Sequence, residues 1–133
     1  MVNFETDFTY GSSQEKKVLP IINEYFERDI KRFENRYDKY DFFDETYVYE
    51  LKSRSNSKDK FPTTMITMNK LSEEKNLILL FNFTDCLTYI EYDKEKFNEY
   101  ETKYFSRAKL KEDEKNHIFI CIEDLTIIKY YNK

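Results

Sequence analysis

Apolar residues recur at helical spacing over residues 13–33, and charged residues lie between them. Ser12 is a suitable N-cap, and Glu15 three positions later is typical of a capping box. We therefore predict a helix over residues 13–33, with a kink at Pro20, because proline lacks a backbone donor. Steps of three and four residues place the apolar side chains on one face of this helix: Val18, Leu19, Ile22, Phe26, Ile30 and Phe33.

Later segments favour β-strands, because they are rich in Leu, Ile, Val, Phe and Tyr and are bounded by polar residues. The first two predicted strands form a hairpin with its turn at Asp44-Glu45. Along the second of these strands the side chains alternate, so that Val48, Glu50 and Lys52 share one face. The predicted strands cover residues 36–43, 46–54, 77–83, 86–92 and 117–122.

Two more segments are predicted to be helices. Pro62 and Thr63 are suited to begin a helix that ends near Lys75, although the run from Thr63 to Met68 is also compatible with a strand. Residues 93–106 form a polar segment with aromatic residues on one side. The order α-β-β-α-β-β-α-β predicts one α/β (α+β) domain over residues 1–133, with a central mixed sheet flanked by helices.

Scarce residue types exclude several classes of enzyme. Gly11 is the only glycine, whereas a P-loop needs two glycines and a dinucleotide-binding fingerprint needs three. His117 is the only histidine, which excludes the HExxH metalloproteases. Together with two cysteines, this histidine cannot complete a zinc tetrahedron. Any chemistry of this chain must therefore rest mainly on carboxylates, lysines, hydroxyls and amides.

The sequence contains no predicted membrane helix or secretion signal. Its longest apolar runs have five residues, whereas a membrane helix needs about 20. The first residues lack the pattern of a signal peptide. We therefore expect an intracellular protein (cytoplasm, nucleus or a viral replication site) that is not secreted and keeps Cys86 and Cys121 as free thiols.

Three carboxylates are predicted to converge at the hairpin. If the turn is centred on Glu45 and Thr46, Asp41 lies opposite Glu50, and two opposed like charges repel unless a cation lies between them. Lys52 shares the face of Glu50, one pleat further along. Glu15 joins them if the first helix covers the hairpin, although taken alone it is more simply explained by the capping box. Such a set suits metal-assisted phosphodiester hydrolysis.

These residues resemble the motif of the PD-(D/E)xK nuclease superfamily: Asp41, then Glu50-Leu51-Lys52, with Glu15 on a preceding helix. The chain departs from the motif at Tyr40, where the family has proline, and in the short spacing from Asp41 to Glu50. The resemblance implies a restriction-endonuclease-like αβββαβ core. Similarity to small nuclease-like proteins of large DNA viruses and phages covers roughly residues 8–83 and rests on segments 8–15, 40–42 and 49–54.

The resemblance also implies roles for these residues. Asp41, Glu50, the Leu51 carbonyl and Glu15 would bind Mg²⁺ or Mn²⁺. Lys52 would orient the attacking water and offset charge in the transition state. The implied activity is metal-dependent cleavage of DNA, by an endodeoxyribonuclease rather than an exonuclease, on branched or damaged substrates.

Two other aspartates are rivals for the acidic role of Asp41. Asp44 is predicted to lie at the hairpin tip, and Asp38 too far down its strand, so Asp41 is preferred. Several basic residues near the motif are candidates for contacts with the nucleic-acid backbone, although most short basic loops are merely solvated. These candidates are Arg54, Lys58 and Lys60 in the loop after the motif, and Lys70 on the next predicted helix.

The net charge of −4 is the main argument against a nucleic-acid enzyme, because affinity for DNA comes largely from neutralising phosphates. Residues 50–75 carry six Lys or Arg against four Asp or Glu. A homodimer or a partner protein would add basic surface. An alternative is a catalytically inactive nuclease-fold protein that binds proteins or nucleic acid as an accessory module. A third, weaker hypothesis is a structural or capsid-associated protein.

Overall fold

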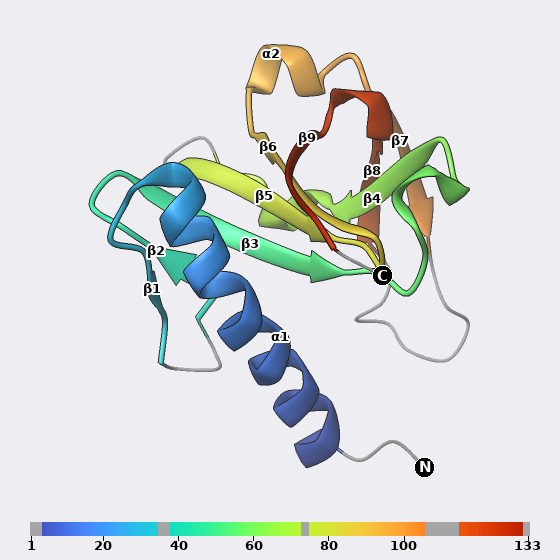
Figure 1. The fold of residues 1–133 in the computed structure, drawn as a ribbon. Helices are drawn as coiled ribbons and strands as arrows, with labels where there is room; N and C mark the ends of the chain where they lie inside the picture. Colours follow the sequence, from blue (N-terminus) through green and yellow to red (C-terminus); the bar gives the residue numbers. More distant parts are fainter. Residues whose placement is uncertain (1–3, 35–37, 73–74, 106–114, 132–133) are drawn as a thin grey trace.

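The computed structural model describes residues 4–34, 38–72, 75–105 and 115–131. A long helix, α1, lies across one face of a mixed six-stranded sheet (Figure 1). A three-stranded sheet packs on the opposite face. Helix α1 spans Phe4–Phe26, and a short helix, α2, spans Lys94–Phe97.

The six-stranded sheet has the order β1-β2-β3-β5-β6-β9, and only its central pair, β3 and β5, is parallel. Its strands are β1 (Lys31–Arg32), β2 (Phe42–Phe43), β3 (Tyr47–Ser53), β5 (Asn76–Asn82), β6 (Cys86–Glu91) and β9 (Thr126–Tyr130). The second sheet is antiparallel, with the order β4-β8-β7. It consists of β4 (Thr63–Thr67), β8 (Lys115–Cys121) and β7 (Glu101–Phe105).

Strand β5 forms the centre of the core, because it is buried on both faces. Toward α1, its residues Ile78 and Leu80 pack with Val18 and Ile22 of the helix. Toward the second sheet, alternate residues of β5 pack in a separate cluster. Members of that cluster include Val48, Leu77, Leu79 and Phe81 from the large sheet and Ile66, Ile118 and Ile120 from the small one. The large sheet is therefore covered on both faces.

The first helix is confirmed, but its predicted bounds of 13–33 are wrong. Ser12 lies inside α1 and therefore does not cap it. The helix ends at Phe26, and Glu27 follows with a φ of 53°, in the left-handed region that terminates helices. The Asn23 side chain then accepts a hydrogen bond from the Ile30 N–H (2.6 Å) and donates one to the Ile30 carbonyl (3.1 Å). These bonds direct the chain back along the sheet.

The predicted helix over residues 63–75 is wrong, whereas the alternative of a strand is confirmed. Thr63–Thr67 forms β4, and the 3₁₀ turn Met68–Lys70 follows. Residues 93–106 are also mostly not helical, since α2 has four residues and β7 follows it. The mixed central sheet is thus confirmed, but its second face is covered mainly by strands, and α2 adds only Phe97 to that core cluster. Among the described residues, no helix is long and apolar enough to cross a membrane.

Candidate active site

The β2–β3 hairpin places Asp41 beside Glu50, as the register predicted. Phe42 pairs with Tyr49, and Asp41 directly precedes Phe42. The Asp41 N–H donates to the Tyr49 carbonyl (3.0 Å), and its Oδ2 accepts from the Leu51 N–H (2.8 Å). These two bonds lie on either side of Glu50, so the aspartate carboxylate is fixed next to it.

Glu50 is an almost fully buried carboxylate, with 3% of its surface exposed. Its Oε2 lies 3.3 Å from the Nζ of Lys52 and 3.6 Å from the Nζ of Lys70. Its Oε1 is buried and has no hydrogen-bond partner. Burial and the charge of Asp41 raise the pKa of Glu50 to about 7, although both lysines act in the opposite direction. This carboxyl group therefore changes its charge near neutral pH.

Lys70 reaches the carboxylates from the 3₁₀ turn that follows β4. Its Nζ donates to the Lys39 carbonyl (2.6 Å), and its own carbonyl accepts from the Tyr40 hydroxyl (2.8 Å). These bonds connect the end of β4 to the segment before β2 and hold the ammonium group at Glu50. Lys70 thus faces the carboxylates, and it does so from a turn instead of the helix predicted for this segment.

Glu15 joins the cluster from the opposite face of the sheet, because it lies on α1. Its Oε1 accepts a hydrogen bond from Nε of Arg32 in β1 (3.2 Å) and forms an ion pair with Nη2 of the same residue (3.1 Å). Burial, then the negative charge of Asp41, raises the pKa of Glu15, and Arg32 opposes this effect. Asp41 therefore connects Glu15 on one side with Glu50 on the other.

The cluster combines three acidic and three basic side chains. Arg32 was not identified from the sequence, because it lies 17 residues from Glu15 and no local pattern links them. Among the described residues, no group of three or more Asp, Glu, His and Cys side chains is arranged to hold a metal ion. The carboxylates instead form a chain of neighbours, Glu15–Asp41–Glu50. Leu51 donates its N–H to Asp41 in this row of carboxylates, and its side chain packs toward α1.

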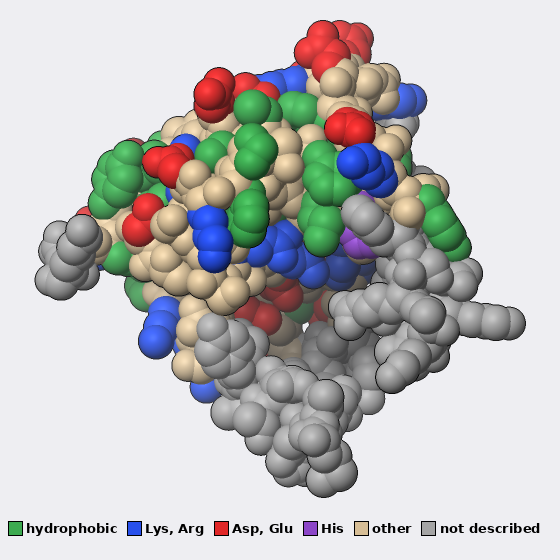
Figure 2. All heavy atoms as spheres, turned by 90° about the vertical axis from the view of Figure 1, so that its right-hand side faces the viewer, with side chains coloured by type: hydrophobic (Ala, Val, Ile, Leu, Met, Phe, Trp, Pro, Cys, Tyr) green, Lys and Arg blue, Asp and Glu red, His purple; other side chains and the backbone are tan. Residues whose placement is uncertain are grey.

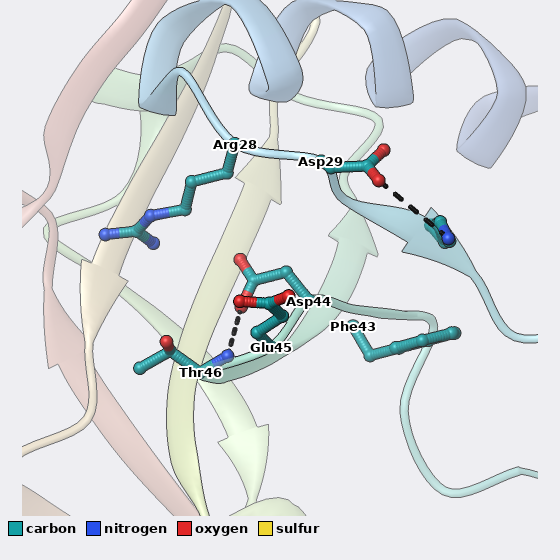
Figure 3. Close-up of a pocket in the computed structure, with 7 residues that line it drawn as sticks. Arg28, Asp29, Phe43, Asp44, Glu45 and Thr46 are labelled. Carbon is teal, nitrogen blue, oxygen red and sulfur yellow. Dashed lines mark hydrogen bonds and ion pairs between the residues drawn. The ribbon is translucent and has the colours of Figure 1, made fainter.

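The rival aspartates have other surroundings. Asp44 lines a pocket of about 460 Å³ next to the hairpin turn, into which Arg28 extends from the segment after α1 (Figure 3). Its Oδ1 accepts the N–H groups of Thr46 and Tyr47, each at 2.7 Å, and its Oδ2 accepts the Tyr49 hydroxyl at 2.5 Å. Although burial opposes it, these bonds and the charge of Arg28 lower the pKa of Asp44.

Asp44 therefore stabilises the turn and lies outside the carboxylate cluster. Asp38, the other rival, is exposed. The structure thus brings together Glu15, Asp41, Glu50 and Lys52, and adds Lys70 and Arg32 to them.

Three of the four residues proposed to bind nucleic acid lie beyond the end of β3, away from the carboxylates. The Arg54 guanidinium donates to the Thr64 hydroxyl (3.2 Å) and to the Met65 carbonyl. Lys58 is half-buried, with its Nζ 3.6 Å from Asp59. Lys60 is exposed and lies over the Phe61 ring. Of the four, only Lys70 contacts the carboxylate cluster.

With the geometry of the cluster established, known proteins offer no further guide to its chemistry. Comparison with family models, curated proteins and solved structures finds no match to this chain.

Proposed function

We propose that this chain is a metal-dependent phosphodiesterase of the PD-(D/E)xK type that cleaves DNA. The observation that carries the proposal is the pair of neighbouring carboxylates beside Lys52, in which Glu50 is almost fully buried and Asp41 is half-buried. Burying like charges side by side is unfavourable for folding. Such an arrangement is typical of active sites, where perturbed carboxyl groups have a chemical role.

The order of elements along the chain supports the same proposal. Helix α1 precedes β1, β2 and β3, and the chain then crosses over to β5, which runs parallel to β3. This order corresponds to an αβββαβ core except in one respect: the crossover contains the strand β4, where the resemblance implies a helix.

The unpartnered oxygen of Glu50 is the feature that fits a divalent cation. A buried carboxylate oxygen without a donor is costly, and a metal ion would supply the missing interaction. Asp41 and Glu50 would hold Mg²⁺ or Mn²⁺, with Glu15 and the Leu51 carbonyl as further candidates. When bound, such an ion lowers the pKa of a coordinated water and offsets charge on the phosphate.

The basic residues of the cluster have distinct roles in this proposal. Lys52 is the more accessible of the two lysines, with 36% of its side chain exposed against 27% for Lys70. Lys52 would therefore contact the scissile phosphate and stabilise its developing charge. Lys70 is tied to the Lys39 carbonyl and would keep the Glu50 side chain in place. Arg32 would do the same for Glu15.

A cleavage assay tests this function. Plasmid, branched DNA and RNA are each incubated with the protein and Mg²⁺ or Mn²⁺, and the wild type is compared with Lys52→Ala and Glu50→Gln. Loss of one charge-stabilising group is expected to slow cleavage by roughly a hundredfold or more. Lys96→Ala, on the exposed surface of α2, is the matched control and should cleave normally. Absence of cleavage, or equal rates for Lys52→Ala and the wild type, would contradict the proposal.

The charge balance favours a second candidate, an accessory module that keeps this fold without catalysis. Three cationic side chains already accompany the three carboxylates, so the cluster is neutral without a metal ion. Titration with Mn²⁺ in a calorimeter distinguishes the two candidates. Binding that disappears in Glu50→Gln supports the enzyme, and no binding together with no cleavage supports the module, whose partners would be a protein, DNA or a second copy of the chain.

A further inference from the structure

Two pockets adjoin beyond the end of β3, and we call them together the Arg54 groove. One pocket, of about 440 Å³, lies on the α1 side and includes Lys17 and Tyr131 in its lining. The other, of about 390 Å³, lies against the small sheet and includes Lys58. Both pockets contain Arg54 and Phe83 in their walls. None of the lining residues is an Asp or Glu, although acidic residues outnumber basic ones in the whole chain.

Arg54 is a half-buried cation without a counter-ion among the described residues. Its guanidinium bonds only neutral oxygens, those of Thr64 and Met65, and lies over the Phe81 ring. Burying a charge without an opposite charge is unfavourable, and a bound anion would remove this cost. A guanidinium has five N–H donors, so donors remain for a phosphate after these two bonds.

The small-sheet side of the groove also offers apolar surface for stacking. Phe61 is 52% exposed and Met65 is 41% exposed, which is unusual for such large apolar side chains. Phe119, the partner of Met65 across the β4–β8 pair, lines the same pocket. Cationic and aromatic groups thus lie together, as in surfaces that bind unpaired bases and their phosphates.

The wider surface agrees with this picture. Figure 2 views the molecule from the side toward which β3 runs in Figure 1. Lys and Arg side chains form a band across the middle of the described surface there, with hydrophobic side chains above it. Asp59 and Asp85 contact Lys58 without lining the groove. Asp59 is 84% exposed, so solvent screens its side of this ion pair, whereas the Lys58 side chain is 16% exposed.

We propose that the Arg54 groove binds single-stranded nucleic acid, with a phosphate at Arg54 and bases on Phe61 and its apolar neighbours. This deepens the proposed nuclease function, on which it rests, by naming an unpaired strand as the ligand. Arg54 follows Glu50 by four residues, directly after the end of β3, and an extended backbone rises about 3.3 Å per residue. The groove therefore begins about 13 Å from the carboxylates, close enough for one bound strand to reach both.

Fluorescence anisotropy with labelled oligonucleotides of about 12 nucleotides tests this groove. The probes are oligo-dT, oligo-U and a blunt DNA duplex, and all measurements are made in EDTA so that cleavage does not contribute. Three phosphate contacts, at Lys17, Arg54 and Lys58, predict that log Kobs falls against log[salt] with a slope of about −2. The two single strands should bind more tightly than the duplex, and comparison of oligo-dT with oligo-U distinguishes DNA from RNA.

Four variants separate stacking and charge from folding. Phe61→Ala should weaken binding about fivefold or more, whereas Phe61→Tyr should restore it, because a tyrosine ring also stacks. Arg54→Gln keeps hydrogen-bond donors but removes the charge, and should reduce the salt slope by about 0.7. Lys96→Ala on α2, outside the groove, should bind as the wild type does. Thermal unfolding of each variant checks that the fold is retained.

The outcomes for the groove and for the nuclease are independent. Glu50→Gln should lose cleavage and keep binding in EDTA. A wild-type protein that binds the single strands in EDTA but cleaves no substrate with Mg²⁺ or Mn²⁺ would support the groove and contradict the nuclease. The groove is contradicted if the wild-type protein binds no single strand or binds the duplex more tightly. It is also contradicted if Phe61→Ala and Arg54→Gln bind the single strands as tightly as the wild type does.

Discussion

Replacing Glu50 by glutamine should stabilise the protein at alkaline pH, because the substitution removes a buried charge and keeps the shape of the side chain. Burial and the charge of Asp41 raise the pKa of Glu50 from 4.5 to about 7. At about 1.4 kcal/mol per pKa unit, this shift means that ionised Glu50 makes the folded protein about 3 kcal/mol less stable than neutral Glu50 does. The contribution of Glu50 to stability is thus full below pH 4.5 and is lost as the pH rises through 7.

Glutamine lacks this titration, so the difference between the two proteins should depend on pH. We compare the free energy of unfolding of Glu50→Gln with that of the wild type at pH 4 and at pH 8. The difference, variant minus wild type, should be about 3 kcal/mol larger at pH 8. Urea unfolding at both values of pH measures the difference, and titrating groups remote from Glu50 cancel because both proteins contain them. A difference that is the same at both values of pH would refute the argument.

Three further predictions concern neighbouring and remote positions. Asp41→Asn removes the negative charge beside Glu50 and so lowers the pKa of Glu50 in the folded protein; in urea unfolding the loss of stability with rising pH should be smaller and should end at a lower pH, and an unchanged profile would contradict this coupling. Leu79→Ala, at a fully buried position of β5, should lower the free energy of unfolding by about 2–5 kcal/mol, and a loss below about 1 kcal/mol would contradict the packing. Asp93 caps α2 by accepting the Glu95 N–H (2.9 Å), so Asp93→Ala should cost about 1 kcal/mol in thermal unfolding while Asp93→Asn costs less.

The pairing of Asp41 with Glu50 was predictable because it depends on a short hairpin. The Asp44 N–H bonds the Tyr47 carbonyl (2.9 Å), which fixes a turn centred on the two residues between them. Once that turn is placed, the pleat determines which side chains share a face. The Asp41–Glu50 pair could therefore be located from local sequence, whereas Glu15 joins it through the packing of α1.

The basic partners of the cluster follow from tertiary structure and leave little trace in the sequence. Arg32 meets Glu15 because Asn23 redirects the chain after α1, and Lys70 meets Glu50 because the Tyr40 hydroxyl anchors its turn. Neither contact is implied by helical or strand spacing. They change the interpretation of the site, since they neutralise carboxylates that the sequence left without partners.

The segment after Pro62 shows how a distant partner can override local signals. Proline followed by threonine is typical of a helix start, and this pattern predicted a helix. The β-branched residues Thr63, Thr64 and Ile66 instead pair with β8, whose position in the fold is not visible from this segment. The same pairing places β7 on the other side of β8, where a polar helix was predicted.

The pairing of β4 with β8 also has a consequence for how the chain reaches its native state. Thr67 pairs with His117, 50 residues later, and Thr63 pairs with Cys121, 58 residues later. During synthesis β4 is therefore made long before its partner, with Ile66 still exposed to water. Contacts between such distant residues slow folding and leave strand edges open to aggregation. We expect slow refolding that is limited by the docking of β8, and a chain truncated before β8 should aggregate although it contains every residue of the carboxylate cluster.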